Sequence, residues 1–311
     1  MKAVIVAPEN PGHLVIETVP APEPGRGEVL VDVAAVSLNR GEVRMTRKPR
    51  PNWRPGWDFA GVVAGGETAL APGTRVVGIA RSGAWAEQVA VPADQIAALP
   101  DAVSFAQAAT LPVAGLTALH ALIKGGFLLE RPVLITGATG GVGDFAIQLA
   151  KLAGAFVVAQ VRKSEQEAQV REAGADAVVV GDRLTDAKQY GPFALIVDSV
   201  GGQILGDALE IVEEGTRIVS LGTSAGNTVT FDAEAFYGKG MTSLYGMILF
   251  DELKTVESAS AGLARLAVLV AKGKLTPRVS IEAPWTEVDA VATQLLERSY
   301  PGKAVLHVAE M

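Results

Sequence analysis

The chain has 311 residues, and at roughly 150 residues per domain this length predicts two domains or one large one. Hydrophobic residues make up 49% and charged residues 20% of the chain, a globular composition that excludes disorder, a coiled coil and a collagen-like structure. The formal net charge of −7, without a long basic tract, argues against nucleic-acid binding.

Cysteine is absent from the sequence, and this excludes a disulfide framework, a thiolate nucleophile, a Cys-held iron–sulfur cluster and a Cys-ligated zinc. The three histidines, His13, His120 and His307, lie far apart without metal-ligand spacing, so we expect no bound metal. The N-terminal apolar run stops at Pro8, and no run approaches 18 apolar residues. We therefore expect a cytoplasmic protein without a membrane segment.

Short segments rich in Val, Ile and Ala alternate with Pro and Gly turns from Met1 to about Pro112. This pattern is typical of an antiparallel, barrel-like or sandwich-like module. The strands are expected at residues 2–6, 14–18, 28–36, 61–63, 75–79 and 84–91. The most basic stretch, from Arg44 to Arg54, is interpreted as a solvated loop.

The pattern changes at about Val113 to strand and helix in alternation, which predicts a parallel sheet covered on both faces. Strands are expected at residues 132–136, 156–161, 177–180, 193–197, 217–221 and 243–249, with helices at 143–153 and 164–173. The last part predicts a helix at 252–272, a strand at 278–282, a helix at 286–298 and a strand at 303–308. We expect this part to return to the first module.

A glycine-rich turn, TGATGGVG at residues 136–143, follows the first buried strand and opens directly into a helix. Gly140 lets a pyrophosphate approach the backbone, and Gly143 lets the helix pack closely on the strand. The N–H groups and the dipole of the helix N-terminus favour the anion. The turn therefore predicts a dinucleotide site, the alternative being a tight turn without a ligand.

The residues after the second strand of this unit decide which dinucleotide is bound. An acidic residue here would bind the ribose 2′-hydroxyl of NAD. The sequence instead reads QVRKS at residues 160–164, with no acid before Glu165. Because Arg162 can bind a 2′-phosphate through two N–H groups and Lys163 adds a second charge, we predict NADP(H). The alternative is a solvated strand end.

Seven short motifs, spread from end to end, give the chain its resemblance to a known family. They are VSLNRGE at 36–42, GWDFAGVV at 56–63, LPVAGLTA at 111–118, the glycine turn, DSVGG at 198–202, SLGT at 220–223 and GKAV at 302–305. In this order they resemble the medium-chain dehydrogenase/reductase superfamily, within it the zinc-free quinone oxidoreductase group. The resemblance implies an α/β fold: a GroES-like antiparallel β-barrel catalytic domain at 1–112, completed by 252–311, and a Rossmann doubly wound parallel-sheet cofactor domain at 113–251.

The resemblance also implies roles for individual residues. Asn39, which lines the nicotinamide and substrate cleft, and Thr117, near the nicotinamide carboxamide, are the candidate catalytic residues. The cofactor-binding candidates are Thr139, Gly140, Gly141, Val142, Gly143, Arg162, Lys163, Ser199, Val200, Gly222, Thr223 and Lys303. Trp57 stands where the zinc-binding branch has a histidine ligand, and Asp182 stands where many relatives have a tyrosine near the 2′-phosphate.

Other polar and aromatic residues are given structural roles. Asp58 is expected to orient loop backbone, and His120 is expected to be packed or at the surface rather than a proton donor. Trp57 and Trp85 are compatible with either a substrate cleft or the core.

The function expected is a zinc-independent, NADPH-dependent oxidoreductase that transfers hydride to quinones or activated enones. Such conjugated acceptors need less electrostatic help than a simple carbonyl. Two alternatives are open: an alkenal or enoyl-thioester double-bond reductase of the same superfamily, and an NADPH-binding protein with little turnover. The resemblance further implies a homodimer formed through the strand at 243–249.

Overall fold

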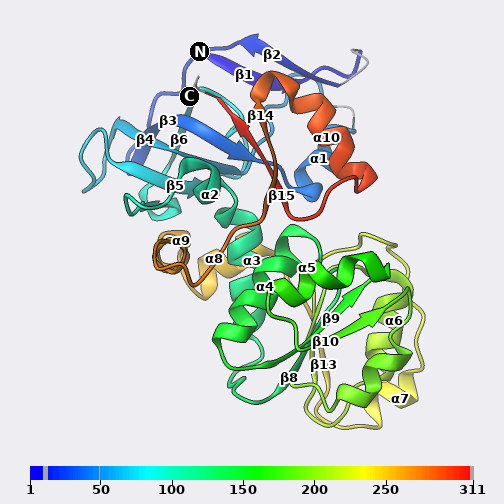
Figure 1. Cartoon of the computed structure of the whole chain (residues 1–311). Helices are drawn as coiled ribbons and strands as arrows, with labels where there is room; N and C mark the ends of the chain where they lie inside the picture. Colours follow the sequence, from blue (N-terminus) through cyan, green and yellow to red (C-terminus); the bar gives the residue numbers. More distant parts are fainter. Residues whose placement is uncertain (10–12, 49, 309–311) are drawn as a thin grey trace. The chain divides into compact units, whose positions relative to one another are not determined.

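Two separate groups of strands, each with its own helices, build the molecule (Figure 1). The computed structural model describes residues 1–9, 13–48 and 50–308. The chain divides into two compact units: unit 1 consists of Met1–Leu116 and Leu253–Met311, and unit 2 of Thr117–Glu252.

Unit 1 is built on a mostly antiparallel seven-stranded sheet in the order β14-β15-β3-β4-β5-β7, with β6 also paired to β3. A separate hairpin, β1 (Lys2–Val6) and β2 (Leu14–Thr18), lies outside this sheet. The sheet strands are β3 (Glu28–Ser37), β4 (Asp58–Gly66), β5 (Arg75–Ile79), β6 (Gln88–Pro92), β7 (Ile96–Ala98), β14 (Val279–Pro284) and β15 (Lys303–His307). Because β15 pairs with β3, the last residues of the chain complete a sheet begun by the first.

The helices of unit 1 range from five to 13 residues, and α2 and α9 pack on strands of the sheet. They are α1 (Arg40–Thr46), α2 (Phe105–Ala109), a wide π-helical turn at Leu111–Gly115, α9 (Ala259–Ala271) and α10 (Val288–Glu297). Helices α3 (Leu116–Ile123) and α8 (Leu249–Thr255) span the two unit boundaries.

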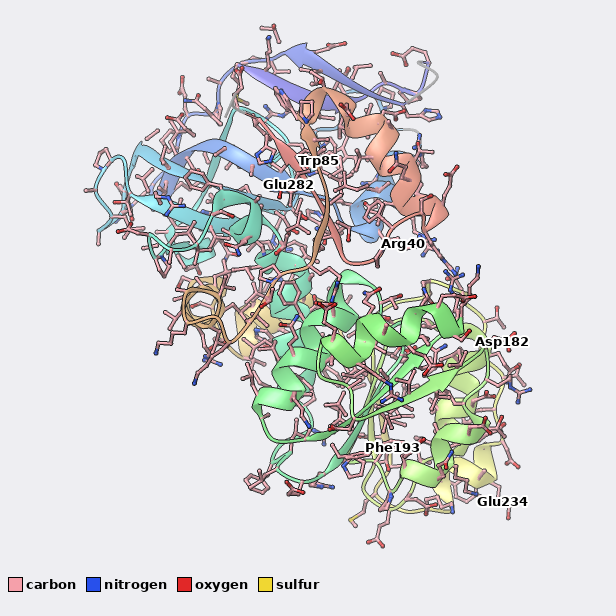
Figure 2. The ribbon with its side chains drawn as sticks, in the orientation of Figure 1. Arg40, Trp85, Asp182, Phe193, Glu234 and Glu282 are labelled. Carbon is pink, nitrogen blue, oxygen red and sulfur yellow. The ribbon has the colours of Figure 1, made fainter. Side chains whose placement is uncertain are left out.

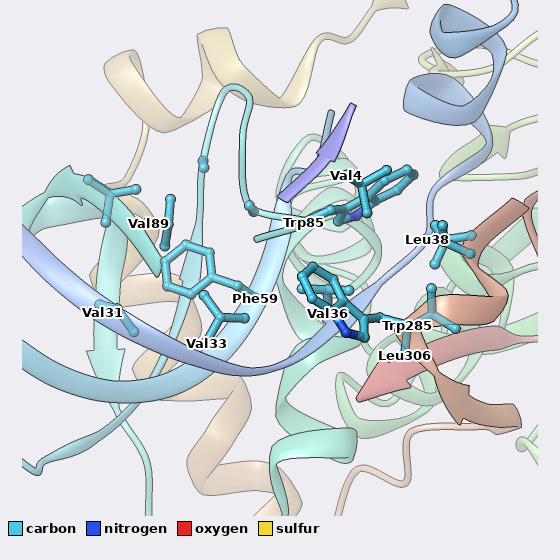
Figure 3. Packing of buried hydrophobic residues seen from close by; sticks show 14 of the residues in the cluster. Val4, Val31, Val33, Val36, Leu38, Phe59, Trp85, Val89, Trp285 and Leu306 are labelled. Atoms are coloured by element: carbon cyan, nitrogen blue, oxygen red, sulfur yellow. The ribbon is translucent and has the colours of Figure 1, made fainter. Parts of the chain in front are cut away.

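The core of unit 1 is aliphatic and aromatic, and it collects side chains from both ends of the sequence (Figure 3). Alternate residues of β3 point inward because successive side chains of a strand face opposite sides. Trp85 is only 1% exposed, so it is a core residue rather than part of a cleft. Gly56 makes room for it, since a Cβ there would lie 2.3 Å from the backbone nitrogen of Trp85.

Unit 2 contains a six-stranded, fully parallel sheet in the order β10-β9-β8-β11-β12-β13. The strands are β8 (Pro132–Ile135), β9 (Phe156–Val161), β10 (Ala177–Val180), β11 (Leu195–Asp198), β12 (Arg217–Ser220) and β13 (Ser243–Gly246). The helices are α4 (Gly141–Leu152), α5 (Glu167–Glu172), α6 (Gly202–Glu210) and α7 (Ala233–Tyr237). Helices α4 and α5 pack on β8, β9 and β10, and α6 packs on β12 (Figure 1).

The strand order reverses between β8 and β11, since the chain builds outward from β8 in one direction and from β11 in the other. Open α/β sheets bind ligands at such a switch point, beyond the carboxyl ends of the strands. This edge of unit 2 is therefore the first place to look for a cofactor site.

Several predicted segments differ from the structure, among them the strands predicted at 61–63 and 243–249, which are β4 at 58–66 and β13 at 243–246. The helix predicted at 252–272 is two helices, α8 and α9, because Ser258 caps α9 by accepting a hydrogen bond from the Ala261 N–H. The strand predicted at 84–91 begins only at Gln88, because the preceding residues turn inward with Trp85. Helix α1 takes up the start of the basic stretch that was interpreted as a loop.

Candidate functional site

Three turns meet at the carboxyl edge of the unit 2 sheet, after β8, β11 and β12. The Thr136 hydroxyl donates to Asp198 Oδ1 at 2.6 Å and accepts from the Ser199 N–H at 3.2 Å. Ser199 Oγ donates to the Thr136 carbonyl at 3.0 Å. These reciprocal bonds fix the turn after β8 against the turn after β11.

The glycine turn has the geometry that its sequence predicts. Gly140 is the N-cap of α4, with extended backbone angles, and it is exposed. Gly143 is buried against the start of the same turn, where a Cβ would lie 2.5 Å from the Gly137 carbonyl oxygen. The first N–H groups of a helix have no acceptor inside the helix, so those of Gly141, Val142 and Gly143 can serve an anion.

The residues after β9 lie beside this turn. The backbone N–H groups of Arg162 and Lys163 both donate to Gln166 Oε1, at 3.1 and 3.2 Å. Gln166 Nε2 in turn lies 3.5 Å from the Thr139 hydroxyl. Both cationic side chains are exposed. Gln166 thus links the backbone of the cationic pair to Thr139 of the glycine turn.

The remaining cofactor candidates of unit 2 lie along the same edge. A Cβ at Gly222 would lie 2.7 Å from the Ser199 carbonyl oxygen, so the turns after β11 and β12 touch through their backbones. Ala225 N–H donates to the Val200 carbonyl at 2.8 Å, and Thr223 follows Gly222 in the second turn. The structure therefore brings together all the unit 2 cofactor candidates from Thr139 to Thr223 at one sheet edge.

Unit 1 contains a second polar group, buried where β15 meets the loop before α1. Lys303 Nζ donates to the Leu38 carbonyl at 2.9 Å, to Asn39 Oδ1 at 2.5 Å and to Asp58 Oδ2 at 3.3 Å. Asn39 Nδ2 donates to Asp58 Oδ2 at 2.8 Å and to Glu42 Oε1 at 2.9 Å. We call Asn39, Glu42, Asp58 and Lys303 the unit 1 polar cluster; all four are buried.

Burial dominates the electrostatics of the carboxyl groups at both places. Desolvation, helped by the neighbouring Asp58, raises the pKa of Glu42 to about 8. Burial also raises the pKa of Asp58, although the Lys303 ammonium opposes this. In unit 2, burial raises the pKa of Asp198 against the hydrogen bonds from Thr136 and from the Gly201 N–H.

The two predicted catalytic residues belong to different units. Asn39 lies in the unit 1 polar cluster, and Thr117 is a buried residue on α3 in unit 2. Asp182, which follows β10, is exposed (Figure 2). The roles predicted for these residues and for Lys303 stay predictions.

Sequence reasoning missed several residues that shape these sites. Glu42 was not singled out, although Asn39 and Glu42 have the spacing of a capping box, and the Asn39 N–H does donate to Glu42 Oε1 at 2.8 Å. Asp58 is expected to orient loop backbone; its Oδ1 accepts instead from the Val113 N–H of the π-helical turn at 2.9 Å, and its Oδ2 pairs with Lys303. Thr136 had no local signal, because its partners Asp198 and Ser199 are distant in sequence, whereas Gln166 has the spacing of a capping box with Lys163.

The histidines do not assemble a metal site in the described residues. His120 is fully buried, with Nδ1 3.9 Å from Glu252 Oε2, and His307 Nε2 lies 2.9 Å from Glu282 Oε2. Within residues 1–9, 13–48 and 50–308, no three His, Asp or Glu side chains converge in a way that could hold a metal ion. With no cysteine in the sequence, this donor set does not fit a zinc site of the Cys and His type. Over the same residues, no helix is long and apolar enough to span a membrane.

Two family models match the chain, one over strands of the unit 1 sheet and the other mainly over the parallel sheet of unit 2. The alcohol dehydrogenase GroES-like domain matches residues 25–101, and the zinc-binding dehydrogenase model matches residues 141–265. Together with the parallel sheet of unit 2, they confirm the predicted α/β fold with a GroES-like domain and a Rossmann-type domain.

Individual proteins resemble the chain in sequence or in structure. A chloroplastic NADPH-dependent alkenal/one oxidoreductase of Arabidopsis thaliana is 32% identical over 64% of this chain, a match that spans only 56% of the plant protein. An acryloyl-coenzyme A reductase of Sulfurisphaera tokodaii is 26% identical over 98% of this chain and 99% of its own. The quinone oxidoreductase of Coxiella burnetii superposes with a TM-score of 0.85 at 27% identity over 99% of both chains. The chain therefore belongs to the medium-chain dehydrogenase/reductase superfamily, in its quinone oxidoreductase-like group.

Proposed function

We propose that the chain is a zinc-independent, NADPH-dependent oxidoreductase that transfers hydride to quinones or activated enones. The observation that carries the proposal is the cationic pair after β9, exposed and linked through Gln166 to Thr139 of the glycine turn. Since no carboxylate stands at the end of β9, a 2′-phosphate meets attraction there instead of repulsion.

The roles proposed for the unit 2 residues follow their positions along the sheet edge. Backbone N–H groups at the start of α4 bind the pyrophosphate, and Arg162 and Lys163 bind the 2′-phosphate. The turns after β11 and β12, with Ser199, Val200, Gly222 and Thr223, bind the rest of the dinucleotide beyond the switch point. Thr117 is proposed to orient the nicotinamide end.

NADPH, when bound, supplies a hydride, and with a proton from solvent this reduces the conjugated acceptor to its dihydro product. In a quinone or an enone the negative charge that develops is spread over a conjugated system, so hydrogen-bond donors suffice to stabilise it. The residues of this chain then contribute mainly by holding the reactants in register. The relatives with alkenal/one, acryloyl-coenzyme A and quinone substrates in their names support acceptors of this kind.

An enoyl-thioester reductase is the second candidate, and one surface feature favours it. Six of the 27 basic residues lie between Arg40 and Arg54, where the only acid, Glu42, is buried. Arg44, Lys48 and Arg50 are exposed there, and exposed cations of this density suit the phosphates of a coenzyme A thioester. An acceptor panel of a quinone, a small enone and an enoyl-coenzyme A separates the candidates. Tight NADPH binding with no acceptor reduced would instead indicate a binding protein with little turnover.

The experiment that tests the cofactor site is a fluorescence titration with NADPH and NADH on the wild type and on Arg162→Glu. We expect the wild type to prefer NADPH and the variant to lose this preference, with affinity for NADPH falling about 10- to 100-fold because a charge-assisted bond is replaced by repulsion. Arg131→Glu is the matched control, since it makes the same charge change in an exposed residue before β8, at the opposite end of the sheet. Equal affinity for both cofactors in wild type and variant would refute the NADPH assignment.

We also propose that the protein is a homodimer that pairs through β13, and its cytoplasmic location stays a prediction. Strand β13 is the last of the unit 2 sheet, and its exposed residues are unusually apolar for a surface strand.

A further inference from the structure

Each polar atom of the Asn39 side-chain amide has a hydrogen-bond partner in the unit 1 polar cluster. Its two N–H groups donate to Asp58 Oδ2 and Glu42 Oε1, and its oxygen accepts from Lys303 Nζ. An amide has two donors and one carbonyl oxygen, so each group of Asn39 has a partner inside unit 1. The Lys303 ammonium is occupied in the same way, with three acceptors for its three N–H groups.

The charges of this cluster do not balance if both carboxyl groups ionise. Glu42 and Asp58 are completely buried and Lys303 is nearly so, and two carboxylates against one ammonium leave one negative charge inside the unit. An uncompensated buried charge costs several kcal/mol. One proton on the two carboxyl groups restores neutrality.

The hydrogen bonds indicate which carboxyl group holds that proton. Asp58 accepts from the Val113 N–H, from Asn39 and from the ammonium, as a carboxylate does. Glu42 accepts both of its bonds at Oε1, whereas no hydrogen-bond partner of Oε2 lies among the described residues. Oε2 of Glu42 is thus the atom that takes the proton, in agreement with its raised pKa.

We propose that Lys303 and Glu42 are positioning residues of the oxidoreductase reaction. Together with Asp58 they hold the Asn39 side chain and its loop in place, an arrangement we call the clamp. The clamp has no net charge only while Glu42 is protonated. The proposal rests on the proposed function. It joins three segments distant in sequence, the loop before α1, the start of β4 and the start of β15. It also changes the role of Lys303 from a cofactor-binding candidate to a structural cross-link, because its ammonium has three buried acceptors in unit 1.

The clamp predicts a specific dependence of activity on pH. Above about pH 8 Glu42 loses its proton, the cluster gains a negative charge, and the loop carrying Asn39 loosens. Asp58 and Lys303 are the charged groups that act on Glu42, one from β4 and one from β15. We therefore expect kcat to fall as the pH rises through about 8, with little change in the KM for NADPH.

The test compares Glu42→Gln with the wild type in kcat–pH profiles from pH 6 to 10. Glutamine keeps the acceptor oxygen for Asn39 but cannot ionise, so the alkaline fall attributed to Glu42 should disappear from the profile. Glu282→Gln is the control, the same substitution on the exposed side of unit 1 beside His307, and it should retain the wild-type profile (Figure 2). An alkaline fall that is unchanged in Glu42→Gln would overturn the proposal.

A double-mutant cycle separates positioning from direct action. Lys303→Met should lower kcat at least tenfold, and Asn39→Ala in the Lys303→Met background should add little, because both remove the same clamp. The double variant Lys303→Met/Asp58→Asn restores neutrality and should recover part of the folding stability if Lys303→Met alone folds poorly. Independent, multiplicative losses of kcat for Asn39 and Lys303 would instead mean that Asn39 acts on the reactants itself.

A readout without turnover distinguishes failure of this inference from failure of the proposed function. A carboxyl group whose pKa is raised by folding stabilises the native state at low pH and loses that effect between the unfolded value, 4.5, and the folded value, about 8. The difference in Tm between Glu42→Gln and the wild type should therefore grow from pH 5 to pH 8 and then level off. If no acceptor is reduced by the wild type, the positioning role falls with the proposed function, and the Tm series still decides whether Glu42 holds the proton. A Tm difference independent of pH would refute the protonated clamp.

Discussion

Gly140 and Gly143 lie in the same turn, but a side chain at each position would meet different neighbours. At Gly143 a Cβ would lie 2.5 Å from the Gly137 carbonyl oxygen and 2.7 Å from Ala138, closer than real Cβ atoms come to backbone. At Gly140 the nearest atom, again the Gly137 oxygen, is 3.4 Å away, an ordinary contact. Gly143 is therefore required by the fold of unit 2, whereas the fold leaves room for a side chain at Gly140.

Alanine substitutions should separate these two requirements. Gly143→Ala forces α4 away from the turn and should destabilise the protein by about 1–3 kcal/mol, measured as the shift of the urea unfolding midpoint. Gly140→Ala should leave that midpoint unchanged but weaken NADPH binding about tenfold, since its methyl group stands where the pyrophosphate approaches the backbone. Unaltered NADPH affinity in Gly140→Ala would argue that the pyrophosphate does not sit on this turn.

Residues whose chemistry depends on neighbours along the chain could be predicted from the sequence. The positions of the glycine turn and of Arg162 are examples, because a strand, a turn and a helix in succession define where each backbone group lies. The unit 1 polar cluster could not be predicted in the same way. Its members come from residues 39, 42, 58 and 303, and only folding of β15 onto β3 brings Lys303 to the other three. The resemblance alone assigns Asn39 to the nicotinamide and substrate cleft and Lys303 to the cofactor, and it gives no sign that the two side chains bond each other.

At the scale of elements, the unit 2 strands are tied together beyond their backbone ladder by the side chains of Thr136 and Asp198. Thr136 follows β8 and Asp198 ends β11, and the hydroxyl hydrogen bonds both to the carboxyl group and to the next N–H, of Ser199. Asp198 is fully shielded from solvent and also accepts from the N–H groups of Val200 and Gly201. The hydroxyl of Thr136 is therefore a junction between the first and fourth strands of the unit.

Replacing this hydroxyl by a methyl group should show how much the junction contributes to the free energy of unfolding. Thr136→Val preserves shape but leaves the Asp198 carboxyl short of one donor, and the free energy of unfolding should fall by about 1–3 kcal/mol. The loss should be larger at high pH, because removing the donor raises further the pKa of a carboxyl group that burial already raises. Thr136→Ser keeps the hydroxyl and should lose much less, so equal losses in the two variants would contradict the role of the hydrogen bond.

Strand positions were predictable wherever an apolar run is bounded by Pro, Gly or charge. Strands β1, β2, β5, β9 and β10 have the predicted bounds. The helix predicted at 252–272 hid a break at Ser258. A serine is compatible with a helix interior as well as with a cap, and only the structure shows its extended backbone and its side chain accepting from the Ala261 N–H. Periodicity reports which face is buried, and it does not report where a helix is interrupted.

The sheet of unit 2 has two edge strands, and one of them exposes large apolar side chains. Strand β10 closes one edge and β13 the other. Strands of a parallel sheet are usually buried on both faces, as β11 is. By contrast, Leu244 and Tyr245 on β13 are 46% and 39% exposed, and Ile248, just beyond the strand, is 64% exposed. An apolar edge strand presents unpaired backbone groups as well, which suits pairing with the same strand of a second copy.

If β13 forms this interface, one charged residue on it should dissociate the dimer without unfolding the chain. We expect sedimentation velocity to find the wild type at twice its 32.2 kDa chain mass and Leu244→Lys at the mass of one chain, because an isologous interface meets the substitution twice. Val180→Lys is the matched control, since Val180 is 42% exposed at the end of β10, on the opposite edge of the same sheet. A wild-type monomer, or a dimer that Leu244→Lys leaves intact, would place the exposed apolar edge outside any interface between copies. Should both lysine variants remain dimeric, the contact must lie on another face of the molecule.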